Sequence, residues 1–282
     1  MASYQWYPGH MTKARRSMQE DIKLVDLIIE IVDARAPLST RNPDIDSMGN
    51  GKLRMIVLNK ADLASKAGND VWSDYFEKKG IRTVMTDSKS GSGVKQLKTM
   101  INEVCAKKKE RDRARGIKNR PVRAMVAGIP NVGKSTFINA IAGRGVTKTG
   151  NRPGVTKGKQ WISIGRDVEL LDTPGILWPK IEDEDAAFRM ALIGSMNDEV
   201  INGDELIAGM IDILKKEYPD TIYTKYGTSS DDDIAAFLEK AAVKLNALSR
   251  GGGPDTERAA SIMLDDFRSG RLGRATLEFP EK

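Results

Sequence analysis

The sequence is poor in the residues on which several protein classes depend. Its 282 residues include one cysteine, Cys105, so no internal disulfide can form and a reducing compartment fits. No apolar run approaches the ~20 residues of a membrane-spanning helix. The N-terminus has Trp6, Pro8 and His10 where a secretory signal would need an apolar stretch. We therefore expect a cytoplasmic protein with no membrane contact.

The sequence also contains a single histidine, His10. Histidine is the one side chain whose unperturbed pKa lies near neutrality, so it is suited to moving protons or polarising water. A lone histidine near a terminus is more commonly an ordinary surface or capping residue. The rest of the sequence has to decide between these two interpretations.

Charged residues, in contrast, are plentiful. They make up 30% of the chain, with 45 basic against 39 acidic residues and a net charge of +6. Together with 40% hydrophobic residues, this composition is typical of a soluble globular protein. The positive balance favours a polyanionic partner. Residues 107–123 (KKKERDRARGIKNRPVR) concentrate the basic residues, and they form either a solvated helix end with a linker or a polyanion contact.

The first two thirds of the chain alternate apolar runs with amphipathic segments. Three runs, at 26–37, 53–62 and 80–91, end in turn-forming or polar residues, and a fourth at 122–136 passes into a glycine-bearing loop. A fifth and a sixth run flank Gly165 and predict a hairpin. This alternation predicts an α/β fold with a mostly parallel sheet of about six strands, covered on both faces.

Beyond Lys180 the strand pattern gives way to helical spacing. Helices are predicted near residues 184–195, 204–218, 231–248 and 255–269. Caps or first-turn acids are expected at Asp204, Asp231 and Asp255. We therefore expect two domains, an α/β domain over 1–180 and a helical domain over 181–282.

Residues 128–135 (GIPNVGKS) fit the pattern G-x-x-x-x-G-K-[ST] between a predicted strand and a predicted helix. Backbone N–H groups of such a P-loop surround the phosphates of a nucleotide, and the helix N-terminus adds a favourable field. Lys134 would reach the β- and γ-phosphates, and the Ser135 hydroxyl would bind Mg²⁺. The residues expected to contact the nucleotide here are Asn131, Val132, Gly133, Lys134, Ser135 and Thr136.

Residues 59–62 (NKAD) follow another predicted strand and indicate guanine selectivity. The Asp62 carboxylate can accept from both N1–H and the exocyclic amine of guanine, whereas adenine offers no such pair of donors. We expect Asn59 and Lys60 to belong to the same nucleotide-binding loop. Ser88 and Lys89, after the next strand, would complete the base pocket through a backbone N–H. ATP is the weaker alternative.

Residues 172–175 (DTPG) end the sixth run, where a carboxylate can act on a nucleotide-bound metal. Asp172 would hold Mg²⁺ through a water, and the Gly175 N–H would meet the γ-phosphate. Thr156, in the segment RPGVT, is the candidate to ligate Mg²⁺ when GTP is bound. Thr147 and Thr149 are alternatives to it.

These motifs are those of a Ras-like GTPase in a different order, because NKAD and the serine loop precede the P-loop. The set resembles the circularly permuted Ras-like P-loop GTPases. The segments WYPGHMTKA, DARAP, NKADL, GIPNVGKST, RPGVT, DTPGILWPK, GGGPDTERAA and DFRSGRLGRATLE resemble, over the whole chain, the bacterial ribosome biogenesis GTPase A family.

The resemblance implies a GTPase, cycling between GTP and GDP, that acts late in assembly of the large ribosomal subunit. Independently of the resemblance, we expect a monomer. It further implies that the factor binds the subunit's rRNA and that the particle stimulates hydrolysis. A K⁺-assisted site with Asn131 as the K⁺ ligand is implied by the family pattern only. In the helical domain, Arg258, Arg268, Arg271 and Arg274 are candidate RNA contacts, with solvated helix faces as the alternative.

The position that carries a water-orienting glutamine in Ras-like enzymes is occupied here by Ile176. An alkyl side chain cannot orient a water, so another residue is needed. In an unpermuted GTPase, the helix after DxxG would precede the strand that begins here near Asp26, so the permuted N-terminus starts in the space of that helix. A helix over about 12–23 would then run from the nucleotide edge of the sheet to the opposite edge, where the strand begins. His10, in a loop before that helix, would emerge at this edge. This agrees with the family, in which the histidine of the N-terminal motif is the proposed catalytic residue.

Two other functional hypotheses remain open at this point. The protein could be an RNA-binding module that uses GTP only as a conformational ligand, which the alkyl side chain of Ile176 would permit. It could also be a GTPase that serves another client, such as small-subunit RNA.

Overall fold

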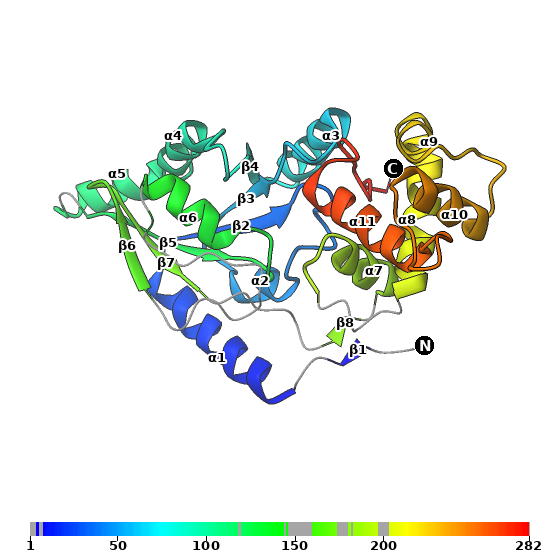
Figure 1. The fold of residues 1–282 in the computed structure, drawn as a ribbon. Helices are drawn as coiled ribbons and strands as arrows, with labels where there is room; N and C mark the ends of the chain where they lie inside the picture. Colours follow the sequence, from blue (N-terminus) through cyan, green and yellow to red (C-terminus); the bar gives the residue numbers. More distant parts are fainter. Residues whose placement is uncertain are drawn as a thin grey trace.

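A computed structural model describes residues 4–5, 8–117, 120–143, 145, 160–173, 180–181, 183–196 and 203–281 of the protein, with the backbone alone at 4–5, 8–15, 160 and 180–181. A six-stranded sheet lies at one end of the molecule and a group of helices at the other (Figure 1). In the part that is described, no helix is long and apolar enough to cross a membrane.

The main sheet has the strand order β4-β3-β2-β5-β7-β6. Its strands are β2 (Leu27–Asp33), β3 (Leu53–Asn59), β4 (Arg82–Thr86), β5 (Val122–Ala127), β6 (Gln160–Ile164) and β7 (Val168–Asp172). All neighbours pair in parallel except β6 and β7, which form an antiparallel hairpin through Gly165. This confirms the predicted α/β fold with a mostly parallel sheet.

Both faces of this sheet are covered, which explains why its central strands read as continuous apolar runs. Successive residues of β2 point to opposite faces, and all seven are buried. Leu27 and Ile29 pack with residues of α4 (Val94–Val104) and α6 (Lys134–Ala142). Ile28 packs with α1 (Pro8–Leu24) and α2 (Asp44–Met48), while α3 (Lys66–Lys78) covers the neighbouring part of that face.

Helix α1 begins at Pro8, four residues earlier than the sequence pattern predicts. The prediction that His10 lies in a loop before the helix is therefore wrong, because its backbone belongs to the first turn of α1. Proline suits this position, since its fixed φ is compatible with a helix and the first turn does not need its N–H. With 17 residues, α1 spans about 25 Å.

The N-terminal segment lies beside the chain that follows the DTPG segment. Strand β1 (Tyr4–Gln5) pairs antiparallel with β8 (Lys180–Ile181). This pairing agrees with the expectation that the N-terminus occupies the space beside the switch region.

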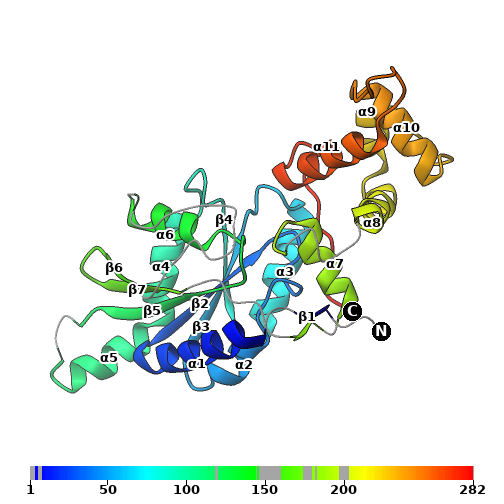
Figure 2. The ribbon, with the colours of Figure 1, turned by 60° about the horizontal axis from the view of Figure 1, so that its bottom comes forward.

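The C-terminal third is helical, as the spacing predicts. Its helices are α7 (Glu184–Leu192), α8 (Gly203–Glu217), α9 (Pro219–Tyr226), α10 (Ile234–Lys244) and α11 (Thr256–Ser269). Asp204 is a first-turn acid of α8 and Asp255 caps α11, but Asp231 is neither, because Asp233 caps α10 by accepting from Ala236 N–H. Figure 2 shows α9 and α10 farthest from the sheet, and α11 leading back toward α3.

The chain after α11 returns to the α/β part and bonds to it. Ala275 N–H donates to the Leu63 carbonyl (2.9 Å), and Leu277 N–H donates to the Arg35 carbonyl (2.7 Å). Trp72 Nε1 donates to the carbonyl of Glu278 at 3.0 Å. The division into 1–180 and 181–282 stays a proposal, and these bonds cross it.

Candidate nucleotide-binding site

The carboxyl ends of β2, β3, β5 and β7 meet at one edge of the sheet, where open α/β sheets bind their ligands. Asn59 ends β3, Asp172 ends β7, and β5 leads into residues 128–133, which precede α6. The structure thus brings together motifs that are more than 100 residues apart in the sequence. Which of these residues contact nucleotide stays a prediction.

The P-loop backbone follows a path that requires glycine at two positions. A Cβ at Gly128 (φ +156°) would lie 2.5 Å from the carbonyl oxygen of Ile31, and one at Gly133 (φ +98°) would lie 2.4 Å from Asn59 Nδ2. Asn131 also has a positive φ, 61°. The loop therefore packs tightly against β2 and β3.

Lys134, the first residue of α6, is buried in this loop. Its Nζ donates to the Ile129 carbonyl at 2.7 Å. Burial lowers the pKa of Lys134 to about 8, and the negative charge of Asp172 opposes that shift. A nucleotide phosphate at this position would raise this pKa and favour the charged form. Ser135 and Thr136 follow in the first turn of α6, where N–H groups favour anions.

Asp172 is buried at the end of β7, and its Oδ1 accepts no hydrogen bond from the residues that the structure describes. Burial raises the pKa of this carboxyl, while the Lys134 cation lowers it. A buried carboxylate oxygen with unused acceptor capacity fits a water bound to Mg²⁺. The described side chains contain no group of three or more His, Cys, Asp or Glu able to hold a metal.

Asn59 connects the NKAD loop, which is predicted to recognise the base, to the P-loop. Its Nδ2 donates to the Val132 carbonyl at 2.7 Å. Its Oδ1 accepts from the hydroxyls of Ser88 (2.6 Å) and Thr86 (3.0 Å) and from the Ser88 N–H (3.3 Å). Asn59 thus fixes three strand ends relative to one another.

Asp62 lies exposed in the turn after β3. Partial burial and the neighbouring Asp87 carboxylate raise the pKa of Asp62. Lys89 N–H donates to Asp87 Oδ1 at 2.9 Å, and Ala61 N–H donates to the Thr86 carbonyl at 3.1 Å. The two loops predicted to contact the base are therefore bonded side by side.

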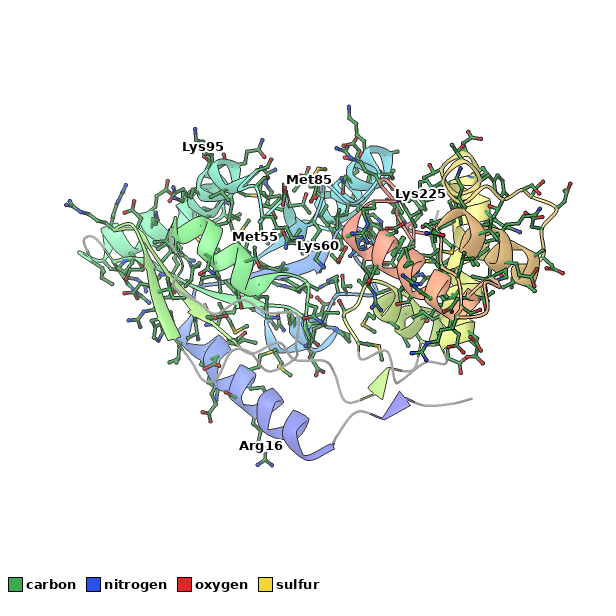
Figure 3. All side chains as sticks on the ribbon, in the orientation of Figure 1. Arg16, Met55, Lys60, Met85, Lys95 and Lys225 are labelled. Atoms are coloured by element: carbon green, nitrogen blue, oxygen red, sulfur yellow. The ribbon has the colours of Figure 1, made fainter. Side chains whose placement is uncertain are left out.

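Lys60 has an ion-pair partner that the sequence reasoning missed. Its Nζ lies 2.9 Å from Asp33 Oδ2, and Arg35 makes a two-pronged contact with the same carboxylate (2.9 and 3.0 Å). Burial alone would raise the pKa of Asp33, but the two cations hold it well below its usual range. Lys60 lies where the sheet meets α11 (Figure 3). Oppositely charged residues two positions apart, at the end of a mostly apolar strand, were the available signal.

The P-loop also contacts the helical part. Asn131 Nδ2 donates to the Gly194 carbonyl at 2.7 Å, just beyond α7. Arg268 of α11 donates to the carbonyls of Ala191 (2.8 Å) and Leu192 (3.2 Å). The C-terminal end of α7 thus lies between the P-loop and α11. These bonds occupy the Arg268 guanidinium, which sequence reasoning proposed for RNA.

Three predicted positions lie outside the described residues: Thr156, Gly175 and Ile176. The backbone of His10 is described, whereas its side chain is not. The role of His10 therefore stays a prediction.

The family described as "50S ribosome-binding GTPase" matches residues 123–245. The match begins in β5, so it includes the P-loop and DTPG but not NKAD at residues 59–62. This agrees with the permuted order, in which NKAD precedes the P-loop. Ribosome biogenesis GTPase A of Bacillus cereus is 41% identical over 279 residues, covering 99% of this chain and 94% of that protein.

Solved structures are similar over almost the whole chain. GDP-bound YlqF superimposes with a TM-score of 0.70 at 30% identity, covering 95% of this chain and 100% of that one. GNP-bound YlqF from T. maritima gives a TM-score of 0.67 at 31% identity, covering 96% of this chain and 99% of that one. Both carry the same fold as the present chain.

Proposed function

This chain belongs to the ribosome biogenesis GTPase A family, and from that premise we propose that it acts in late assembly of the large ribosomal subunit, with the subunit stimulating hydrolysis. It binds guanine nucleotide and hydrolyses GTP in ribosome biogenesis. The hypothesis that GTP is only a conformational ligand is accordingly dropped.

The observation that carries the nucleotide assignment is the bond from Asn59 to the Val132 carbonyl. It holds the NKAD loop against the P-loop although the two occur in reversed order along the chain. Asp62 would then accept from guanine while Lys134 and the first turn of α6 face the phosphates.

Mg²⁺ would be held by the Ser135 hydroxyl, by Asp172 through a water, and by Thr156 in the GTP state. A bound Mg²⁺ neutralises charge that develops on the phosphate oxygens. The unused Asp172 Oδ1 supports this assignment. Asn131 is the proposed K⁺ ligand through its side-chain oxygen Oδ1, while its Nδ2 can keep donating to the Gly194 carbonyl.

Water orientation is assigned to His10, because Ile176 cannot provide it. The pairing of β1 with β8 supports this proposal, since it keeps the N-terminal segment beside the chain that follows DTPG. His10 would act when the ribosomal surface positions this segment.

Co-sedimentation with separated ribosomal subunits tests the client. We expect the protein with a non-hydrolysable GTP analogue to pellet with large subunits and not with small ones, and large subunits to raise the rate of phosphate release. Pelleting with small subunits alone would overturn the large-subunit assignment and favour the other client.

A further inference from the structure

The positive charge of this chain is concentrated in one segment. Residues 107–123 contain nine of the 45 basic residues and two of the 39 acidic ones. The rest of the chain therefore holds 36 basic and 37 acidic residues and has a net charge of −1. The net positive charge of the protein therefore comes entirely from these 17 residues.

The segment begins as a helix that buries none of its side chains. Helix α5 (Ala106–Ala114) has no buried residue. Four cations in it or just after it are exposed and form no ion pair with the described part of the chain: Lys107, Arg111, Arg113 and Arg115. Lys108, in contrast, pairs with Asp26 and Asp112.

The arrangement of these cations does not favour the helix consistently. Lys107 and Arg111 are like charges at i and i+4, as are Arg111 and Arg115, and such pairs destabilise an isolated helix by about 0.2–0.5 kcal/mol each. Lys107 also lies in the first turn, where the helix dipole favours anions. Arg111 and Arg113, however, lie in the last turn, where the dipole favours cations. The charge pattern therefore has opposing effects on the stability of α5, and the helix has no buried face that explains it.

The exposed cations continue onto the nearby edge of the sheet. Arg120 follows α5 and pairs with Asp26 at 3.5 Å. Arg123 lies in β5, pairs with Glu169 at 3.0 Å, and has its guanidinium 5.1 Å from the ring centroid of Trp161. Trp161, in β6, is 41% exposed, which is unusual for so large an apolar side chain. An exposed ring beside cations is the arrangement on which an unpaired base stacks.

Helix α5 and its cations are remote from the nucleotide site, whereas Trp161 pairs with Leu171, one residue before Asp172, and lies nearer to it. Helix α5 precedes β5, so it lies at the amino edge of the parallel strands, whereas the P-loop and NKAD lie at the carboxyl edge. In both Figure 1 and Figure 2, α5 and the α7–α11 helices lie at opposite ends of the molecule.

We propose that Lys107, Arg111, Arg113, Arg115, Arg120 and Arg123, here called the basic ridge, bind RNA phosphates, and that Trp161 stacks on an unpaired base of that RNA. The proposal rests on the proposed function, because it makes ribosomal RNA the partner. It adds a contact at the end of the molecule opposite to the helical part and independent of nucleotide. RNA fits better than an acidic protein, since phosphates match a line of exposed guanidinium groups and a base matches the exposed ring.

The test neutralises four ridge cations in the full-length protein and leaves all catalytic and nucleotide-binding residues intact. The ridge variant is Lys107→Gln, Arg111→Gln, Arg113→Gln and Arg115→Gln. The matched control removes four exposed lysines of α3 and α4 for which the described contacts include no ion pair: Lys66→Gln, Lys78→Gln, Lys95→Gln and Lys98→Gln.

Binding is measured for purified large subunits and, separately, for a short RNA with a single-stranded end, over a series of salt concentrations. We expect the ridge variant to bind both at least tenfold more weakly. The slope of log affinity against log salt should be smaller by roughly 0.7–0.9 for each phosphate that the variant no longer neutralises. The control should behave as wild type, and all three proteins should keep the same GDP affinity.

The Trp161→Ala variant should weaken binding of the single-stranded RNA by roughly tenfold without changing the salt slope, because stacking releases no counterions. Wild-type affinity and salt slope in the ridge variant would overturn the inference. Loss of subunit binding in the ridge variant, without any RNA binding by wild type, would point to an acidic protein and also overturn it. Failure of wild type to bind large subunits would count against the proposed function, while the RNA measurement would still decide the role of the ridge.

Discussion

Asp62 is the residue on which guanine selectivity is expected to depend. Its carboxylate lies in a turn bonded to the Ser88–Lys89 loop, through the bond from Ala61 to Thr86. The change Asp62→Asn replaces one acceptor oxygen with a donor that faces the guanine amine. We expect GTP affinity to fall roughly 100-fold or more, and xanthosine triphosphate to bind better, because its 2-oxo group accepts from the new amide.

Equilibrium titration with both nucleotides checks this expectation. Asp87→Asn is the matched control, since it removes a neighbouring carboxylate that has no proposed contact with the base. Unchanged GTP affinity in the Asp62 variant would rule out this base pocket.

Lys134 should make nucleotide binding depend on pH. Its pKa is lowered to about 8 by burial, and phosphates would favour the charged form. Because the bound-state pKa is then the higher one, binding takes up a proton above pH 8 and affinity falls as the pH rises through that value. Calorimetry of GDP binding in buffers of different ionisation enthalpy should detect roughly 0.7 protons taken up at about pH 8.5 and close to none at about pH 7. No difference between the two pH values would contradict the lowered pKa.

His10 is expected to act in chemistry and not in binding. The His10→Ala variant loses no proposed phosphate, Mg²⁺ or base contact, so GTP affinity and GTP-dependent subunit binding should survive. Particle-stimulated hydrolysis should fall by roughly 10²-fold or more, the effect of losing one positioned acid–base or water-orienting group. Single-turnover hydrolysis on large subunits is the measurement, and a wild-type rate there would make His10 an ordinary terminal histidine.

The turn after β2 links the base-recognition loop to α11. Arg35 is 1% exposed and bonds to Asp33, while its Nη1 lies 3.5 Å from the carbonyls of Phe267 and Arg268. Asp33 in turn holds Lys60, whose φ of 57° is costly for a residue with a side chain. The strained NKAD backbone is therefore supported through Asp33 and Arg35.

The Arg35→Met variant should be less stable by about 3–5 kcal/mol, because it leaves a buried carboxylate with one cation instead of two. It should also bind GDP more weakly, since Lys60 loses part of its support. Urea unfolding and GDP titration measure the two effects. Arg82→Met is the control, because Arg82 and its partner Glu103 are both half-exposed and such pairs contribute about 0–1 kcal/mol. Equal stability of the two variants would contradict the supporting role of Arg35.

The strands and the P-loop could be predicted from the sequence because their signals are local. The apolar run of β2, the glycines at 128 and 133 and the Asp255 cap each act within a few residues. The N-terminal end of α1 was predicted too late, because Pro8 and Gly9 are typical of turns and proline is equally suited to a first helical turn.

The contacts of Arg35 and Asn131 could not be predicted in the same way. Arg35 bonds to a carbonyl 232 residues away, and Asn131 to one 63 residues away. Neither partner is a side chain, so no residue type marks the contact in the sequence. The motif DARAP pointed to Arg35 through the family resemblance, but its contacts with α11 are visible only in the fold.

Among the described contacts, hydrogen bonds from the P-loop and from the turn after β2 link the nucleotide edge of the sheet to the helices. Asn131 of the P-loop contacts the end of α7, and Arg35 beside the NKAD loop contacts the end of α11. A movement of the P-loop on nucleotide exchange would therefore act directly on α7 through Asn131. The basic ridge lies at the other end of the sheet. A chain cut at residue 180 would lack both of these bonds together with those of residues 275–278.

The return of the chain to Arg35 and Leu63 has a consequence for synthesis. Residues 267–277 are translated more than 200 residues after the turn and loop that they support. A nascent chain can form β2, β3 and the P-loop early, but the NKAD loop lacks its partners from α11 until that part of the chain has left the exit tunnel. We therefore expect the predicted guanine pocket to be completed near the end of translation, and a partly synthesised chain to hold nucleotide less firmly than the finished one.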